Sequence, residues 1–262
     1  MSWTVIIPFF NEAGFIGATI ASFGAQQRRP DRLVLVDNAS TDGSAAVARA
    51  AAEAAGLAAI HLHEERPGKI HALESAMAHI ATDFVALTDA DTVYPPHYLA
   101  LAERMLATPG VVAAMAIGVS GDPHSAANRR LRRWRAGVMA RIAPKQTHTG
   151  GYGQCFRSSA LIAAGGFSEA QWPYVLLDHE IMQRVLKQGR AAYDPDLWCL
   201  TSDRRADRRR VRWTVVERFL YHVTPFALKD WYFYRFLGPR LKRRRLTHLN
   251  LREKSWVSPD ER

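Results

Sequence analysis

The sequence predicts an α/β fold in which a mostly parallel central sheet is flanked by helices. Short apolar segments rich in β-branched residues occur at residues 3–8, 33–36, 59–63 and 84–88. Segments with apolar residues at helical spacing separate them, at residues 15–23, 44–56 and 69–80. Strands that alternate with helices are typical of a parallel sheet. The chain has 262 residues, of which 48% are hydrophobic and 23% are charged, so it can bury a core, and disordered or collagen-like classes are excluded.

The first two strands each end in a polar loop. The run at residues 3–8 closes at Pro8, and the polar residues Asn11 and Glu12 follow it. The second strand, at residues 33–36, ends abruptly in the string DNASTDG at residues 37–43. This string can cap the alanine-rich helix after it, and capping is the simpler explanation for Asp42. For Asp37, capping and ligand binding are equally consistent with the sequence.

The later elements continue the alternation. A strand at residues 84–88 runs into the string DAD at residues 89–91, and residues 111–119 form another apolar run. Residues 150–156 are strand-like, Ser158 begins a short helix that ends at Gly165 and Gly166, and a helix with one apolar face runs over residues 178–189. Residues 128–145 carry seven basic and no acidic side chains, and their pattern predicts no definite element.

The excess positive charge lies near the C-terminus. The net charge is +10, and residues 204–245 contribute fourteen basic and three acidic side chains, which leaves the rest of the chain nearly neutral. The composition therefore predicts a catalytic domain at residues 1–205 and a basic, helical C-terminal extension at residues 206–262. Neither a signal peptide nor an apolar run long enough to cross a membrane is evident. Two separated cysteines without metal-type spacing favour a reducing compartment, so a cytoplasmic location is expected.

Acidic residues follow several predicted strands. They are Glu12, Asp37, Asp89 and Asp91. In open parallel sheets, ligands bind beyond the carboxyl ends of the strands. Asp89 and Asp91 are two residues apart in an extended segment, so both carboxylates point to one side, where they repel each other unless a cation lies between them. Mg²⁺ or Mn²⁺ suits such oxygen ligands and leaves positions for phosphate oxygens.

Two families carry a motif of this kind. The string DADTV at residues 89–93 resembles the nucleophile motif of haloacid-dehalogenase-type phosphatases, in which Asp89 would attack phosphorus. That family usually opens its fold with the motif, whereas about eighty residues of strand and helix precede it here. The phosphatase is therefore the weaker alternative.

A more extensive resemblance connects residues 3–205 with family 2 glycosyltransferases of the GT-A fold. It rests on six segments in the order that this family has: VIIPFFNE at 5–12, LVDNASTDG at 35–43, PGKIHAL at 67–73, DAD at 89–91, GYGQCFR at 151–157 with GGF at 165–167, and DHE at 178–180 with Arg184 and Gly189. Six ordered segments are more specific than any one of them. The resemblance implies an inverting transfer of a sugar from a nucleotide-diphosphate donor, typically a UDP-sugar, to an acceptor hydroxyl.

The resemblance also implies roles for particular residues. The nucleotide-binding residues would be Pro8, Asn11, Glu12, Asp37, Lys69 and Asp89. Asp37 would bind the base, Asp89 would face the ribose or the sugar, and Asp91, together with Asp89, would hold Mn²⁺ or Mg²⁺ at the diphosphate. The general base would be Asp178, with Glu180 in reserve, because the family commonly has Glu-Asp here and this chain has Leu177 before Asp178. A helix-capping role is the alternative for Asp178.

The histidines and aromatic residues allow simpler explanations. His61 and His63 alternate along a strand, but without a third ligand nearby a packing or surface role is more common. His222 or His248 is a candidate third metal ligand, as a late histidine is in some members of the family. Trp172 and Tyr174 could stack on a sugar ring or pack in the core.

The basic C-terminal segment interleaves arginine with aromatic residues. This composition suits a helix at a membrane interface, where arginine and lysine meet anionic lipid, and it predicts a peripheral enzyme on the inner face of the membrane with a lipid acceptor. An ordinary solvated basic face is the alternative. Binding of nucleic acid or another polyanion is a second class of function, but no RNP1 motif or zinc finger supports it. A dinucleotide dehydrogenase is excluded because no Gly-x-Gly-x-x-Gly follows the first strand.

Overall fold

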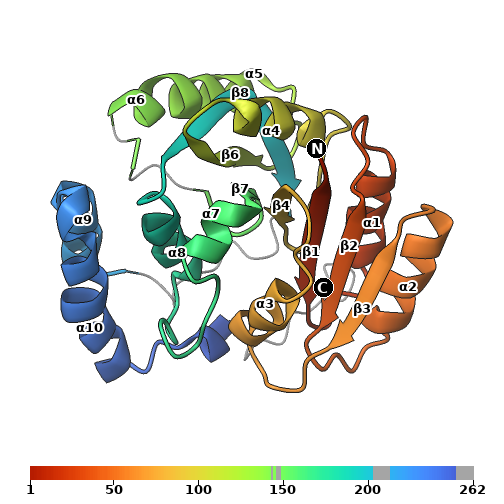
Figure 1. The fold of residues 1–262 in the computed structure, drawn as a ribbon, viewed down its shortest axis with the longest axis horizontal. Coiled ribbons are helices and arrows are strands. Elements are labelled where there is room, and N and C mark those ends of the chain that lie inside the picture. Colours follow the sequence, from red (N-terminus) through yellow and green to blue (C-terminus); the bar gives the residue numbers. More distant parts are fainter. Residues whose placement is uncertain (143, 146–148, 203–212, 252–262) are drawn as a thin grey trace.

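The computed structural model describes residues 1–142, 144–145, 149–202 and 213–251. Within these residues, eight strands form one sheet in the order β3-β2-β1-β4-β7-β6-β8-β5 (Figure 1). Their bounds are β1 Trp3–Phe9, β2 Arg32–Asp37, β3 Ala59–His63, β4 Phe84–Leu87, β5 Thr92–Val93, β6 Val111–Val119, β7 Gln154–Arg157 and β8 Arg190–Thr201. The predicted α/β class is confirmed.

Helices cover both faces of the sheet. In chain order they are α1 Ile16–Gly24, α2 Ser44–Ala54, α3 Lys69–Met77, α4 Tyr98–Ala107, α5 Ala126–Arg133, η1 Trp134–Met139, α6 Ala140–Ile142, α7 Ser158–Ala163, α8 Leu177–Val185, α9 Val215–Val223, η4 Phe226–Leu228, η5 Trp231–Leu237, α10 Gly238–Arg243 and η6 His248–Leu251. None of the described helices is both long enough and apolar enough to span a bilayer.

The two faces of the sheet build two separate cores. Side chains alternate along β1, so that Val5 and Ile7 pack with α1, α2 and α4, whereas Ile6 packs with α3, α7 and α8. Every residue of β1 is buried, as expected for a parallel strand covered on both sides. This explains why the strands at residues 3–8, 33–36 and 84–88 could be predicted from continuous apolar runs.

The sheet is mixed, with parallel pairs in the majority. β3, β2, β1 and β4 are parallel neighbours, and so are β6 and β8, whereas β7 is antiparallel to β4 and β6, and β5 is antiparallel to β8. β8 was not predicted from the sequence, because Asp194, Pro195 and Asp196 at its centre are residues that are rare in strands. Register shifts between β6 and β8 accommodate this segment.

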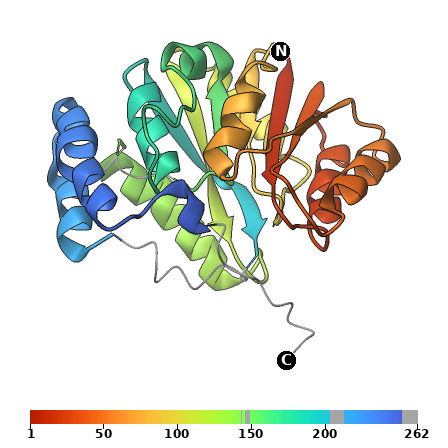
Figure 2. The same ribbon diagram turned by 90° about the horizontal axis from the view of Figure 1, so that it is seen from below.

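Of the C-terminal segment, α9, η5 and α10 pack as a layer at the end of the molecule opposite β3, whereas η6 lies beside α3 (Figures 1 and 2). Tyr221, Tyr232 and Phe233 are buried together with Trp172 and Val175, which precede α8. Trp172 and these three aromatic side chains therefore belong to a core. The helical pattern breaks between α9 and η4 at Pro225, which cannot continue a helix. The boundary at residue 205 stays a prediction, and residues 203–212 lie outside the described residues.

Candidate active site

Three neighbouring parallel strands bring the predicted acidic residues to one edge of the sheet. β1 pairs with β2 in a register that sets Phe9 beside Asp37, and with β4 in a register that sets Ile6 beside Leu87. The carboxyl ends of the three strands therefore lie side by side. Asp37 is the last residue of β2, and Asp89 follows the end of β4 by two residues. Pro8 lies within β1 as a register partner of Val36, next to this edge.

The loops after β1 and β2 hold each other through side chains. The Asn11 side-chain oxygen accepts a bond of 2.8 Å from the Thr41 main-chain N–H, and Ser40 Oγ accepts one of 3.1 Å from the Asn11 N–H. The Glu12 N–H donates to Ser44 Oγ at 2.7 Å, and the Glu12 side chain is buried. Asn11 has a positive φ of 52°, a conformation that asparagine tolerates better than most residues. Asn11 thus shapes the loop, and its predicted contact with a nucleotide stays a prediction.

Asp42 has a structural role in the same pair of loops. Its carboxylate accepts main-chain hydrogen bonds from Ala13 at 3.1 Å and from Ser44 at 3.0 Å. Burial raises the pKa of Asp42, but the hydrogen bonds from Ser44 and Ala13 outweigh it, and the pKa is held below its ordinary value. Asp42 is not the cap of α2, because the residue before the helix is Gly43 and no side chain caps this end, but it does bind the main-chain N–H of Ser44, the first residue of the helix.

Asp37 is only 9% exposed and is held on both carboxylate oxygens. Its Oδ1 accepts a bond from the Ser40 N–H at 2.9 Å, and its Oδ2 lies 3.3 Å from His63 Nδ1 on the neighbouring strand. His63 is thus a partner of Asp37, because the register of β2 and β3 places the two residues side by side.

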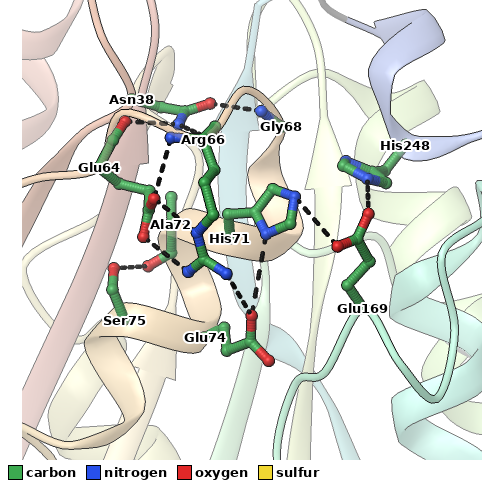
Figure 3. Close-up of polar contacts among 10 residues, drawn as sticks. All are labelled: Asn38, Glu64, Arg66, Gly68, His71, Ala72, Glu74, Ser75, Glu169 and His248. Carbon is green, nitrogen blue, oxygen red and sulfur yellow. Dashed lines mark hydrogen bonds and ion pairs between the residues drawn. The ribbon is translucent and has the colours of Figure 1, made fainter.

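Asn38 positions the loop that leads to Lys69, a role that was not predicted from the sequence. Its side-chain oxygen accepts the Gly68 N–H at 2.7 Å, and its amide donates to the carbonyl oxygens of Glu64 and Arg66 at 3.0 and 2.7 Å (Figure 3). Three bonds from one buried amide fix the approach to α3. The signal in the sequence is only the position of this asparagine directly after Asp37, whereas its burial, at 3% exposure, is a finding of the structure.

Lys69 and Asp89 form an ion pair at the sheet edge. Lys69 is the first residue of α3, and its Nζ contacts Asp89 Oδ1. Asp91, two residues further on, is 8% exposed. The Thr19 hydroxyl donates to the Ala90 carbonyl at 2.8 Å, and Thr92 and Val93 pair with β8, so the Asp-x-Asp segment is held from both sides.

The glycine pair Gly150 and Gly151 connects this ion pair with Asp178. A Cβ atom on Gly151 would lie 3.1 Å from Lys69 Nζ, and one on Gly150 would lie 3.6 Å from Asp178 Oδ2. Gln154 Nε2 donates to the Asp178 carbonyl at 3.0 Å and to the Thr149 carbonyl at 3.1 Å. Lys69, Asp89 and Asp178 therefore flank one short segment, although 20 and 89 residues separate them in sequence.

Asp178 lies in the first turn of α8 without capping it. The residue before the helix is Leu176, and no side chain caps this end. Asp178 Oδ1 accepts the His179 main-chain N–H at 3.0 Å and lies 3.0 Å from His179 Nδ1, and both side chains are 24% exposed. The His179 ring packs edge-on against Trp213 and Tyr221. His179, for which the sequence predicted no role, thus orients the Asp178 carboxylate.

Glu180 forms a buried ion pair with Arg184. Its side chain is fully buried, and its two oxygens receive bonds of 2.8 Å from Arg184. Tyr234 of η5 donates its hydroxyl to the same carboxylate, and Arg184 also donates to the Gly166 carbonyl at 2.7 Å. Glu180 thus joins α8 to the Gly165-Gly166 turn and to the C-terminal helices. This geometry gives no support to its reserve role as a base.

The sequence matches the family model for glycosyl transferase family 2 over residues 4–163. The chain belongs to this family, whose reaction is sugar transfer, and its fold is the GT-A fold of the solved glycosyltransferases that it resembles. Because the chain belongs to this family, the alternative in which Asp89 is the nucleophile of a phosphatase is not supported. A search of the curated proteins found no match.

Three solved structures illustrate the likeness. A mannosyltransferase, PcManGT from Pyrobaculum calidifontis, in complex with GDP-Man and Mn²⁺, is 24% identical over 92% of this chain and 72% of its own, with a TM-score of 0.66. Residues 1–349 of TarS from S. aureus, in complex with UDP-GlcNAc, are 16% identical over 97% and 76%, with a TM-score of 0.64. Glucosyl-3-phosphoglycerate synthase from Mycobacterium tuberculosis, with Mg²⁺ and UDP, is 18% identical over 86% and 80%, with a TM-score of 0.56.

The different settings of Asp178 and Glu180 predict different costs of substitution. Glu180→Gln leaves the buried Arg184 guanidinium without its ionic partner and should lower the free energy of unfolding by about 3–5 kcal/mol. Asp178→Asn, at a partly exposed position, should lower it by less than about 1 kcal/mol. Urea denaturation of both variants measures the difference, and equal losses of stability would contradict the structural role of Glu180.

Proposed function

We propose that the protein transfers a sugar from a nucleotide-diphosphate donor to an acceptor hydroxyl, with inversion at the anomeric carbon. The observation that carries this proposal is the meeting of the Lys69 and Asp89 pair with Asp178 at Gly150 and Gly151. The Lys69 ammonium, for the diphosphate, and the Asp178 carboxylate, for the acceptor, thus flank one short glycine segment, and the Tyr152 ring packs on its Gly150.

The residues at the strand ends fit a divalent cation and a nucleotide. Asp89 and Asp91 offer carboxylate oxygens, which Mg²⁺ and Mn²⁺ prefer, and both are held in place by the contacts of the Asp-x-Asp segment. We assign Asp91, with Asp89, to the cation, and Asp37, Glu12, Pro8 and Asn11 to the nucleoside side of the site. When bound, the cation stabilises charge on the diphosphate oxygens. The neighbours with bound GDP-Man and Mn²⁺, or UDP and Mg²⁺, support such a donor complex.

A UDP-sugar is the donor that we favour. Asp37 is buried and oriented by Ser40 and His63, so its carboxylate can accept a hydrogen bond from the imide N–H of uracil. Two of the solved structures hold UDP or UDP-GlcNAc, which agrees with this choice, whereas the mannosyltransferase holds GDP-Man on the same fold.

Lys69 and Asp178, on the two sides of the glycine pair, have different roles in the proposed reaction. Asp178 accepts the proton of the acceptor hydroxyl as its oxygen bonds to the anomeric carbon, while the bond from that carbon to the phosphate oxygen breaks. The bond electrons leave with the nucleoside diphosphate, whose additional charge the Lys69 ammonium stabilises. His179 holds the Asp178 carboxylate in one orientation. Attack from the face opposite the leaving group inverts the anomeric centre.

The exposed apolar side of α9 supports a lipid surface as the location of the acceptor. Val215, Val216, Phe219 and Val223 recur at helical spacing and are 79%, 62%, 62% and 52% exposed. The opposite side of α9 buries Tyr221, and α10, which carries Arg240, Lys242 and Arg243, belongs to the same layer of helices (Figure 1). An exposed apolar stripe beside arginine and lysine fits an anionic bilayer, with the apolar side chains among the acyl chains.

Asp91→Asn should remove the cation-dependent part of donor binding. Loss of one carboxylate ligand should weaken binding of UDP in the presence of Mn²⁺ by at least about tenfold, which is about 1.4 kcal/mol. Calorimetry with UDP, with and without Mn²⁺, measures this. Asp83→Asn is the matched control, because Asp83 is exposed and precedes the other end of β4. If UDP binding depends on Mn²⁺ equally in both variants, Asp91 is not a ligand of the cation.

Asp178→Asn should leave UDP binding intact and lower turnover by about 10²–10⁴-fold, because an amide cannot accept the proton. The assay measures release of nucleoside diphosphate from a panel of nucleotide sugars, with and without lipid extract, which also identifies the donor. An active Asp178→Asn enzyme would show that another group is the base.

Membrane binding should depend on the apolar stripe of α9. The wild-type protein should sediment with vesicles containing anionic phospholipid, less so at high salt, because charge attraction is screened. Val216→Asp with Phe219→Asp should abolish this binding, whereas Ile162→Asp, at a 54% exposed site on α7, should retain it. If the wild-type protein shows no salt-sensitive binding to these vesicles, the proposed location of the acceptor at a membrane is wrong.

A further inference from the structure

Three segments far apart in the sequence meet at His71, Glu169 and His248. His71 lies on α3, Glu169 on the connection between α7 and α8, and His248 on η6 (Figure 3). One ligand atom from each residue lies within 4.8 Å of the others. We propose that these three side chains form a second metal site, selective for a Zn²⁺-like transition metal, whose ligands do not include Asp89 or Asp91. This site is independent of the proposed sugar transfer.

Two of the three distances between ligand atoms match those required by a single ion, and the third lies within the 4.8 Å that encloses the cluster. His71 Nε2 lies 3.5 Å from Glu169 Oε2, and His248 Nε2 lies 3.3 Å from Glu169 Oε1. A tetrahedral ion with bonds of about 2.0–2.1 Å separates neighbouring ligand atoms by about 3.3–3.4 Å. The two imidazole rings lie 5.1 Å apart between centroids and stand nearly perpendicular, at 80°. Both Nε2 atoms therefore face the same carboxylate at a spacing that a bound ion needs.

The donor set selects the type of metal. Two imidazoles and one carboxylate suit Zn²⁺ and its neighbours in the first transition series, whereas Mg²⁺ and Ca²⁺ prefer all-oxygen sites. The His71 and His248 side chains are 7% and 5% exposed, but Glu169 is 47% exposed. The site is thus enclosed on the side of the imidazoles and open on the side of the carboxylate, where water can complete the coordination.

The surroundings of the two rings support this orientation. The Nδ1 atoms of His71 and His248 are buried without a hydrogen-bond partner among the described residues. His71 Nδ1 lies 3.8 Å from Glu74 Oε2, so a small shift of Glu74 would give the N–H its acceptor, as is common behind metal-bound histidines. His248 packs so closely on Gly68 that a Cβ atom there would lie 2.0 Å from Nδ1. Only glycine at this position leaves room for the ring.

A bound ion would connect the C-terminal segment to the helix that carries Lys69. His71 is two residues after Lys69, whose ammonium contacts Asp89, and His248 belongs to η6, after the C-terminal helices. Because the three ligands come together only in the folded chain, the metal should stabilise that state. The proposed role is a clip that holds η6 against the start of α3.

Zinc titration of the full chain tests this site. The protein carries Asp91→Asn to weaken the oxygen site, lacks a polyhistidine tag and is freed of metal with chelator. We expect one equivalent of Zn²⁺ to bind by calorimetry, with a rise of about 5 °C in Tm. Co²⁺ should give visible absorption bands of a site with low coordination number. His71→Ala and His248→Ala should each weaken binding by about 100-fold or more, and Glu74→Gln by about tenfold.

His79→Ala is the matched control, because His79 lies just beyond α3 and outside the cluster, and it should bind Zn²⁺ as the parent does. Circular dichroism confirms that each variant is folded. If the Asp91→Asn parent takes up no Zn²⁺, the proposal is wrong, and that result needs no further variant. Unchanged affinity in a folded double variant of His71 and His248 would equally overturn it. Neither result bears on the proposed sugar transfer, because no readout uses activity.

Discussion

The candidate site depends on the main-chain pairing of β1 with β2 and β4. Parallel hydrogen bonds fix the register of these strands, and their carboxyl ends meet at one edge. Side chains that follow the strands are thus gathered at this edge, where the loops after β1 and β2 also bond to each other. A shift of one residue would turn Ile6 and Val5 into the opposite cores, which makes the register costly to change. The positions of Asp37 and Asp89 are a consequence of the packing of these two cores.

A second level of organisation comes from the loops. Asn38 holds the turn before Lys69, and Gln154 holds the backbone at Asp178. Gly150 and Gly151 let Lys69 and Asp178 approach the same short segment from different helices. Each of these contacts joins segments that are remote in sequence. The arrangement gives a cation and a carboxylate a common neighbour, which is what a transfer between a diphosphate and a hydroxyl requires.

Acidic residues of this chain have different tasks that their local sequences do not distinguish. Asp42 and Glu180 satisfy main-chain N–H groups and a buried guanidinium, respectively. Asp178, two residues before Glu180, is partly exposed and lies beside the glycine pair. The difference arises because successive residues of a helix point in different directions, so one carboxylate faces the core and the other faces the site.

The sequence alone determined the class of fold, most strands and helices, and the ordered motifs that connect the chain to its family. These features are local, because apolar runs, helical spacing and polar strand ends are read over short windows. The tertiary structure decided the rest: β8, whose strand depends on pairing with β6, the partners of Asn38, the packing of His179 on Trp213 and Tyr221, the contact of Tyr234 with the buried Glu180, and the meeting of His71, Glu169 and His248. Each of these depends on contacts between residues distant along the chain, and such contacts exist only once the segments have packed.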